Sequence, residues 1–305
     1  MSTQTVFMQG FQQHRKEVNN VEINYVVAGE GVPLLLLHGH PQNLIVWRKV
    51  AAAFVSAGYK VIASDLRGYG DSSKPAGGAN HSNYSKREMA KDQVDLMHRL
   101  GHQQFTVIGH DRGGRVAHRM ALDHSDAVER IVVIDIAPTA TMYARTDMEF
   151  ARRYFWWFFL IQPAPLPETM IGHDPEFFLQ RHVRGQLAAP DAGHVSTDAF
   201  NEYLRCYRKP ETIAAVCEDY RAAATIDLAH DAEDSDARIT APLLALWGGK
   251  GTVGALYNVV ETWREKATDV TGRELPCGHS LMEEEPKLFT DEVLAFLSAT
   301  SKPAT

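Results

Sequence analysis

The alternation of apolar and polar segments predicts strands and helices in regular succession up to residue 138. Short, continuous apolar runs (VPLLLLHG, YKVIASD, QFTVIGHD and RIVVIDIAP) end in glycine, aspartate or proline, as is typical of strands buried on both faces of a parallel sheet. VEINYVV at 21–27 alternates, which indicates an outer, antiparallel strand. Helical stretches at 44–57, 85–100 and 112–124 lie between these runs. The sequence therefore predicts βαβ units in a mostly parallel, doubly wound sheet.

The pattern changes after residue 138. Between 141 and 236 no buried-strand run occurs, and apolar residues recur at helical spacing, as in ARRYFWWFFLIQ and ETIAAVCEDYRAAA. The acidic stretch DLAHDAEDSDARI is expected to be a solvated return connection. Strand pattern resumes with APLLALWGG, followed by a helix at 256–267, a strand at 270–275, a helix at 286–299 and a frayed SKPAT tail. We expect an α/β core at 1–140 and 237–305, interrupted by a helical cap at 141–236.

Composition and charge narrow the classes of partner. The chain has 305 residues, 45% hydrophobic and 23% charged, which suits a soluble protein with one large α/β domain and an insertion. The net charge of -7 argues against nucleic acid or an anionic membrane as a partner, and means that an anionic substrate needs a local basic site. Three widely spaced cysteines, no signal pattern in MSTQTVFMQG and no long apolar run predict a reducing, cytoplasmic location.

The stretch GHDRGGRVAH at 109–118 holds the candidate nucleophile. It follows the strand-like QFTVI and opens a helical stretch, and Gly109 and Gly113 supply the small residues that a tight strand-to-helix turn requires. The frame resembles the nucleophile turn of α/β-hydrolases, but Asp111 stands where serine is usual. The sequence therefore predicts a carboxylate nucleophile.

An aspartate at this position restricts the chemistry. Attack on a carbonyl carbon would give a high-energy anhydride, whereas attack on a saturated carbon with a good leaving group gives an alkyl ester that water can hydrolyse. The helix N-terminus and the adjoining Arg112 and Arg115 should keep Asp111 ionised. We therefore expect displacement at carbon, as in halides or epoxides.

The second step needs a base, an acid that orients it and two oxyanion donors. LPCGHSLMEEEP places His279 between the last strand and the last helix, and VVIDIAP places Asp135 at the carboxyl end of a buried strand. The alternative is that Asp135 caps a loop and Asp269 orients the histidine. The backbone N–H groups of His40, in HGHPQ, and of Arg112 are the expected oxyanion donors.

On these residues, and on DLRGYGDSSKP, CEDYRAAATID, QPAPLPE and LPCGH, the whole chain resembles the haloacetate dehalogenases of the α/β-hydrolase fold. HGHPQN and DLRGYGDSSKP are shared with epoxide hydrolases and haloalkane dehalogenases, while GHDRGGR, CEDYRAAATID and QPAPLPE are more specific. The resemblance implies an α/β-hydrolase fold with a cap, hydrolysis of a haloacetate to glycolate and halide, and a homodimer. Water, carboxylate and imidazole suffice for this chemistry, so no metal or organic cofactor is expected.

The resemblance also implies how substrate is held. Arg112 and Arg115 match the arginines that bind the substrate carboxylate, which suits the bidentate geometry of a guanidinium. Trp157 and Tyr220 match the halide-binding tryptophan and tyrosine, but Trp156 stands where the family has histidine. An indole has a single N–H donor and carries no charge, so cleavage of the C–F bond is the activity most affected if Trp156 contacts halide. The alternative is that Trp156 only packs inside the cap.

Three other functions remain open from the sequence. An epoxide hydrolase would use the same Asp and His, with Tyr220 and either Tyr203 or Tyr207 as acids, but gives no reason for the two arginines. A haloalkane dehalogenase is disfavoured for the same reason, and because tryptophan commonly follows its nucleophile where Arg112 stands here. A binding protein that lost turnover would keep its affinity after Asp111→Asn. The preferred halogen and the tolerance of longer 2-haloacids are not determined by the sequence.

Overall fold

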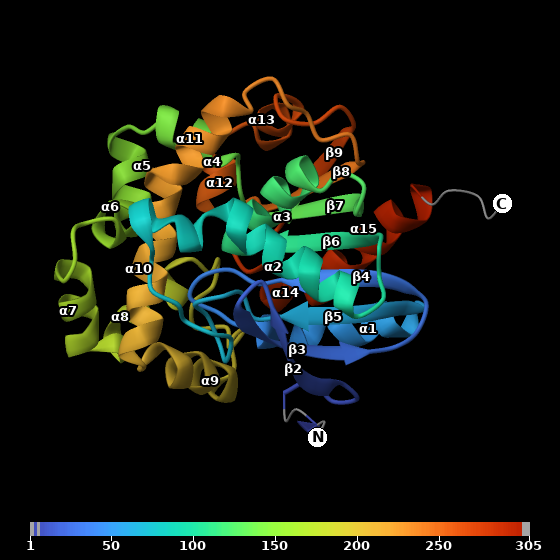
Figure 1. The fold of residues 1–305 in the computed structure, drawn as a ribbon, viewed down its shortest axis with the longest axis horizontal. Helices are drawn as coiled ribbons and strands as arrows, with labels where there is room; N and C mark the ends of the chain where they lie inside the picture. The colour runs from blue at the N-terminus through green and yellow to red at the C-terminus, as the bar shows by residue number, and fades with distance from the viewer. Residues whose placement is uncertain (1–2, 5–6, 301–305) are drawn as a thin grey trace.

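A single nine-stranded sheet runs through residues 3–4 and 7–300, the part of the chain that the computed structural model describes (Figure 1). The strand order is β1-β2-β3-β5-β4-β6-β7-β8-β9. Pairs from β5 through β9 are parallel, while β1, β2 and β3 form an antiparallel flank. The bounds are β1 (Thr3–Gln4), β2 (Gln12–Val18), β3 (Val21–Ala28), β4 (Val32–Leu37), β5 (Tyr59–Ser64), β6 (Phe105–His110), β7 (Val128–Ile134), β8 (Leu243–Gly248) and β9 (Val270–Leu275). The SKPAT tail lies outside the described residues.

The apolar runs predicted as buried strands are β4, β5, β6 and β7, and every residue of β6 is buried. The alternating run at 21–27 is the antiparallel strand β3. Strand β2 was not predicted, because its sequence QQHRKEV is polar and only Val18 is fully buried. A strand near the edge of an antiparallel sheet can face water, so it carries little apolar signal.

Helices cover both faces of this sheet. In Figure 1, α2 and α3 lie in front of the strands, and α1 and α15 lie behind them. The predictions for α2, α3 and α15 are confirmed to within a residue or two, and two other predictions are wrong in detail. The stretch 44–57 is broken at Val50 into a 3-10 helix and α1, and the helix expected at 256–267 is two short helices separated by the extended Tyr257. The bounds are η1 (Leu44–Lys49), α1 (Ala51–Ser56), η2 (Ala79–Tyr84), α2 (Lys86–Arg99), α3 (Arg112–Asp123), α12 (Thr252–Leu256), α13 (Val259–Arg264), α14 (Leu281–Glu284) and α15 (Pro286–Ala299).

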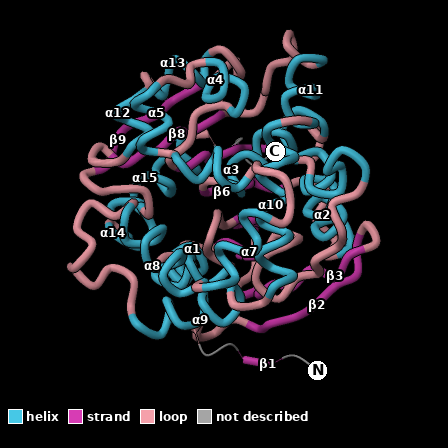
Figure 2. The backbone as a smooth tube through the Cα atoms, turned by 90° about the vertical axis from the view of Figure 1, so that its left-hand side faces the viewer, coloured by secondary structure: helices cyan, strands magenta, loops and turns pink. Residues whose placement is uncertain are grey.

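Helices α4 to α11 follow β7 and precede β8 in the sequence. In space they gather at one end of the sheet, which faces the viewer in Figure 2. None of the helices within residues 7–300 has the length and apolar character needed to cross a membrane; the cytoplasmic location stays a prediction. The bounds are α4 (Thr139–Ala144), α5 (Met148–Arg153), α6 (Phe155–Leu160), α7 (Leu166–His173), α8 (Pro175–Gly185), α9 (Thr197–Tyr207), α10 (Pro210–Ala224) and α11 (Ile226–Glu233). We refer to these helices as the cap.

The acidic stretch expected as a solvated connection is helical in its first part, where the prediction was wrong, while 234–238 is a partly or fully exposed connection. Its first part belongs to α11, where the buried Asp227 accepts a hydrogen bond of 2.7 Å from the backbone N–H of Lys86. Asp234 follows the helix and forms ion pairs with Arg119 at 2.7 Å and Arg87 at 2.8 Å. The acids therefore dock the end of the cap onto α2 and α3 because they meet arginines and a helix N-terminus there.

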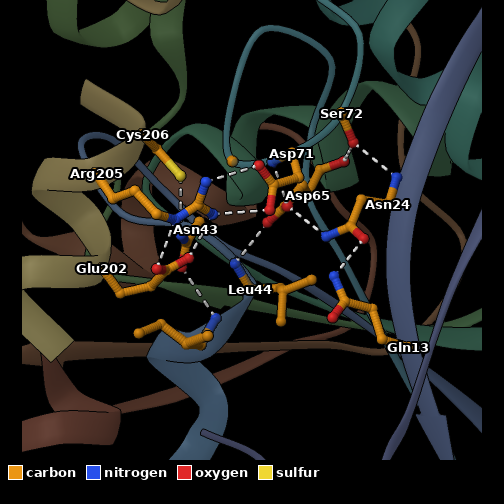
Figure 3. Close-up of polar contacts among 12 residues, drawn as sticks. Gln13, Asn24, Asn43, Leu44, Asp65, Asp71, Ser72, Glu202, Arg205 and Cys206 are labelled. Atoms are coloured by element: carbon orange, nitrogen blue, oxygen red, sulfur yellow. Dashed lines mark hydrogen bonds and ion pairs between the residues drawn. The ribbon is translucent and has the colours of Figure 1, made fainter. Parts of the chain in front are cut away.

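An ion pair between Arg205 and Asp71 also holds α9 against the core (Figure 3). Arg205 forms two hydrogen bonds to the carboxylate of Asp71, at 3.1 and 2.7 Å. The loop that carries Asp71 is fixed in turn by the buried carboxylate of Asp65, which accepts hydrogen bonds from the backbone N–H groups of Asp71 at 2.9 Å and Leu44 at 2.8 Å, and from the side chain of Asn24 at 2.7 Å. The cap is thereby tied to the loops at the carboxyl ends of β4 and β5.

Candidate active site

Asp111 lies at the turn between β6 and α3, with φ 45° and ψ -112°. A positive φ is strained for a residue with a side chain and persists only where the surroundings enforce it. A Cβ atom on Gly109 would lie 2.4 Å from the carbonyl oxygen of Gly113, and one on Gly113 would lie 2.4 Å from that of Leu37. The two glycines of the motif are therefore required by close backbone packing around Asp111.

The carboxylate of Asp111 is positioned by backbone groups. Its Oδ2 accepts a hydrogen bond of 3.0 Å from the N–H of His40, one of the two expected oxyanion donors. The other, the N–H of Arg112, occupies the first position of α3, where no intrahelical acceptor is available. A Cβ on Gly39 would lie 2.5 Å from the Cβ of Asp111, so the approach of the two loops depends on that glycine.

The charges around Asp111 favour its ionised form. Burial opposes ionisation, but the charges of His279, Arg115 and Arg112 hold the pKa of Asp111 well below its ordinary range. Asp111 is therefore a buried carboxylate anion with one oxygen held by a backbone N–H.

His279 is paired with Asp135. The Nδ1 of His279 lies 2.5 Å from Oδ2 of Asp135, whose Oδ1 accepts a 3.0 Å hydrogen bond from the backbone N–H of Gly248. Asp135 also has a positive φ of 50°. The backbone carbonyl of the alternative, Asp269, accepts from the N–H of Leu243 at 2.9 Å at the start of β8. The structure thus brings Asp135, and not Asp269, to the imidazole.

The pKa of His279 depends on these two acids. Burial disfavours its protonated form, but the hydrogen bond and charge of Asp135, together with the charge of Asp111, raise the pKa above the ordinary 6.5. A reaction that neutralises Asp111 removes one of the negative charges that raise the pKa of His279. The pKa of His279 then falls, so the imidazole is neutral and able to act as a base at a lower pH than before.

This coupling predicts that Asp111→Asn lowers the pKa of His279. The variant removes a nearby negative charge while leaving the bond to Asp135, so the imidazolium loses part of its stabilisation. The measurement is an NMR titration of the His279 ring in the parent and the variant. Asp71→Asn, which removes the partner of Arg205 on α9, is the control and should leave the pKa of His279 unchanged. An unchanged or higher pKa in Asp111→Asn would contradict the coupling.

The two arginines beside Asp111 differ in their partners. Arg112 is fully buried and bound by Asp219 of α10, with Nε–Oδ2 and Nη2–Oδ1 distances of 2.8 Å each. Its guanidinium carbon also lies 4.2 Å from the ring centroid of Tyr220. Asp219 additionally binds Lys86 and accepts a 2.6 Å hydrogen bond from the hydroxyl of Tyr69. Sequence reasoning missed Asp219, although an acid within the apolar ETIAAVCEDYRAAA was a signal for a buried charge.

Arg115 has no acidic partner among residues 7–300. Its Nη1 donates to Thr139 Oγ1 at 2.9 Å, and its guanidinium carbon lies 4.7 Å from the ring centroid of Trp157. Burial and the like charge of Arg112 lower the pKa of Arg115. Arg112 Nη1 and Arg115 Nε are buried without a hydrogen-bond partner among the described residues. The pair therefore carries an excess positive charge and two unused N–H donors beside the nucleophile.

The cap supplies aromatic side chains over this site. Trp157 and Tyr220 are buried, with ring centroids 6.4 Å apart. The ring of His40 lies between two hydroxyls, with Nδ1 3.3 Å from that of Tyr220 and Nε2 3.0 Å from that of Tyr207. Burial lowers the pKa of His40 to about 3, so the ring is neutral. The ring of His40 had been expected to matter less than its backbone N–H, since its sequence position gives no hint of the two tyrosines.

Trp156 and Tyr203 are placed differently from the residues above. Trp156 is 9% exposed and its ring contacts those of Tyr154 and His182, at centroid distances of 5.3 and 4.6 Å. Trp156 also lines a chamber of about 680 Å³ on the outer side of the cap. Tyr203, considered as a possible acid, binds Glu283 at 3.3 Å instead of reaching His40. Within the described residues, no group of three or more His, Cys, Asp or Glu side chains could hold a metal ion.

Comparisons with known proteins show the family of this chain. The α/β hydrolase fold family matches residues 32–286. Fluoroacetate dehalogenase from Burkholderia sp is 43% identical over 278 residues, 91% of each chain. Soluble epoxide hydrolase from Corynebacterium sp. (strain C12) is 33% identical over 287 residues, 93% of this chain and 96% of that one. The crystal structure of a candidate acyltransferase from Salmonella enterica has 58% identity and a TM-score of 0.95, covering 97% of this chain and 98% of that chain. The chain is therefore a hydrolase of the α/β-hydrolase fold family and groups with its haloacetate-dehalogenase-like members.

Proposed function

We propose that this protein hydrolyses a haloacetate to glycolate and halide through an alkyl ester on Asp111. The observation that carries the proposal is the excess charge beside the nucleophile. Of the two buried guanidiniums only that of Arg112 is paired with an acid, Asp219, and Arg112 and Arg115 each retain an unused N–H donor. A substrate carboxylate between them would supply the missing acceptor and place its α-carbon against Asp111.

In the first step, Oδ1 of Asp111 attacks the α-carbon while Oδ2 stays on the N–H of His40. The new C–O bond forms as the carbon–halogen bond breaks, and the halide leaves with the bonding electron pair. In-line displacement sends the halide away from Asp111, toward Trp157 and Tyr220 of the cap. Their N–H and O–H groups are the proposed donors to the departing anion.

In the second step, His279 takes a proton from water, whose oxygen attacks the carboxyl carbon of Asp111. The oxyanion forms on Oδ2, where the N–H groups of His40 and Arg112 stabilise it. Collapse breaks the ester C–O bond, and glycolate leaves with the proton from His279. The regenerated Asp111 carboxyl then ionises and releases one proton, so each turnover yields glycolate, halide and a proton.

The direct test is halide release from chloroacetate, followed with an ion-selective electrode. We expect multiple turnovers by the parent protein and none by Asp111→Asn. Substrate affinity in the variant should persist, because the arginines are intact. A parent protein that binds chloroacetate but releases no chloride would overturn the enzyme assignment and favour a binding protein.

Recognition of the carboxylate predicts a substrate-dependent effect of Arg115→Ala. Losing a charge-assisted hydrogen bond should raise KM for chloroacetate by on the order of 10- to 100-fold. The KM for neutral chloroacetamide should change far less. Arg119→Ala, one helical turn further along α3 and paired with Asp123 and Asp234, is the matched control. Equal effects of Arg115→Ala on both substrates would count against carboxylate recognition.

Epoxide hydrolysis is the second candidate function. It is favoured by the hydroxyls of Tyr207 and Tyr220 on either side of His40, which could protonate an opening epoxide oxygen. A neutral epoxide, however, leaves the excess charge of Arg112 and Arg115 without an acceptor. Turnover of a neutral epoxide in the same assay series, with no halide released from any haloacetate, would favour this alternative.

We further propose that a second copy of the chain covers the outer side of the cap. Large apolar side chains are exposed along α5 to α8, which is costly for a monomer. We expect a dimer mass for the parent protein by light scattering, and a monomer for the doubly substituted Met170→Glu, Phe177→Glu. A monomeric parent would refute the homodimer. The exposed fractions are Met148 77%, Phe155 49%, Leu166 49%, Met170 59% and Phe177 66%.

A further inference from the structure

His182, on α8 of the cap, is a buried polar side chain that the mechanism above does not use. It is 5% exposed, and within residues 7–300 the hydrogen bond that a side chain makes to it, from Gln186, goes to its backbone carbonyl and not to a ring nitrogen. Its ring lies edge-on between those of His40 and Trp156, at centroid distances of 4.5 and 4.6 Å. The unpaired ring nitrogens of His182 are not sealed off in the way those of His110 and His118 are, so they are open to a ligand that completes their hydrogen bonding.

The surroundings of His182 place it at the cap side of the reaction. Its neighbour His40 contacts both the nucleophile, through its N–H, and the hydroxyl of Tyr220, through its ring. The charges of Asp111 and His279 are both close enough to act on its pKa, which burial and His40 lower well below the ordinary value. His182 is thus a neutral imidazole with one N–H donor and one lone pair.

The displacement step needs donors on that side. Asp111 attacks from the core, so the departing atom moves toward α8 and α10 of the cap. Tyr220 offers one O–H and Trp157 one N–H. His182 is an unpaired donor whose ring contacts that of His40, and the ring of His40 in turn contacts Tyr220 at 5.4 Å between centroids. We propose that His182 donates its ring N–H to the departing halogen and thereby sets which carbon–halogen bonds the enzyme cleaves. The inference rests on the proposed dehalogenation and deepens it.

The outer chamber supports this role. His182 and Trp156 both line it, together with the exposed Phe155, Met170 and Phe177, so the ring that contacts His40 also faces a chamber bounded by exposed cap residues. We expect a halide that leaves Asp111 toward this chamber to pass His182. The donor is therefore on the exit path of the anion, and no core residue described above occupies that position.

The test compares His182→Phe with the parent on fluoro-, chloro- and bromoacetate. Poorer leaving groups depend more on hydrogen bonds, so kcat should fall steeply for fluoroacetate, on the order of 10- to 100-fold relative to the effect on bromoacetate. KM should change little, because the carboxylate is bound by the arginines. His182→Gln keeps a donor and should restore part of the loss. His98→Phe, at an exposed position of α2, is the control and should behave like the parent.

A second measurement does not depend on turnover. In an Asp111→Asn background, chloride binding is followed by quenching of indole fluorescence, and His182→Phe should weaken it while unfolding at the temperature of its parent. Loss of activity that is equal for all three halogens, or unchanged chloride binding, would overturn the role of His182. A parent protein that releases no halide from any haloacetate would instead overturn the proposed function.

Discussion

His279→Asn is expected to release one equivalent of halide per subunit and then stop. The first step needs only an ionised Asp111, and the charges of Arg115 and Arg112, which act to lower its pKa in the parent, remain in this variant. The second step needs a base to deprotonate water, and the amide cannot replace it. Loss of a general base typically slows a step by on the order of 10²–10⁴-fold, so the ester on Asp111 should accumulate.

The trapped ester is detected by mass spectrometry. The protein should gain the mass of one carboxymethyl group, located on the peptide that contains Asp111. His98→Asn, an exposed histidine of α2, is the control and should turn over normally. Steady turnover by His279→Asn would mean that another base serves the second step, and a variant without a burst would mean that His279 acts before the ester forms.

The sequence predicts well those features that depend on neighbours along the chain. Buried parallel strands are continuous apolar runs, and the strand-to-helix turn around Asp111 is encoded within seven residues, GHDRGGR. The packing distances explain why, since a Cβ at Gly109 or Gly113 would collide with backbone atoms of the same turn or of the adjacent β4. Strand β2 lacked such a signal because its side chains are largely in water.

Features that depend on contacts between the cap and the core could not be predicted from the sequence. Arg112 and Arg115 are equivalent in the motif, and only a partner 107 positions away, Asp219, distinguishes them. The ring of His40 acquires its role from tyrosines on α9 and α10. A sequence pattern shows which charged groups and donors are present but not which of them are paired in the fold. In this site the proposed function is inferred from the groups that are unpaired.

Asp219→Asn is expected to be strongly destabilising. The side chains of Asp219 and Arg112 are both fully buried, and Lys86 of the same cluster is nearly so. Removing the anion leaves two cations in the interior, and breaking a buried pair in this way typically costs about 3–5 kcal/mol. Asparagine keeps the shape of the side chain and part of its hydrogen bonding, so the decrease in the free energy of unfolding is due mainly to the lost charge. Urea unfolding of the parent and the variant measures it.

The matched control is Asp71→Asn, which breaks the ion pair with Arg205 at the edge of the cap. That pair is partly solvated, so its loss should cost less than about 1 kcal/mol. A similar small cost for Asp219→Asn would show that Arg112 and Lys86 find solvent or other acceptors, and the excess charge beside Asp111 would then no longer follow from the geometry. A large cost confined to Asp219→Asn instead means that the cap carries the anion that fixes Arg112, and that Arg115 is left to the substrate.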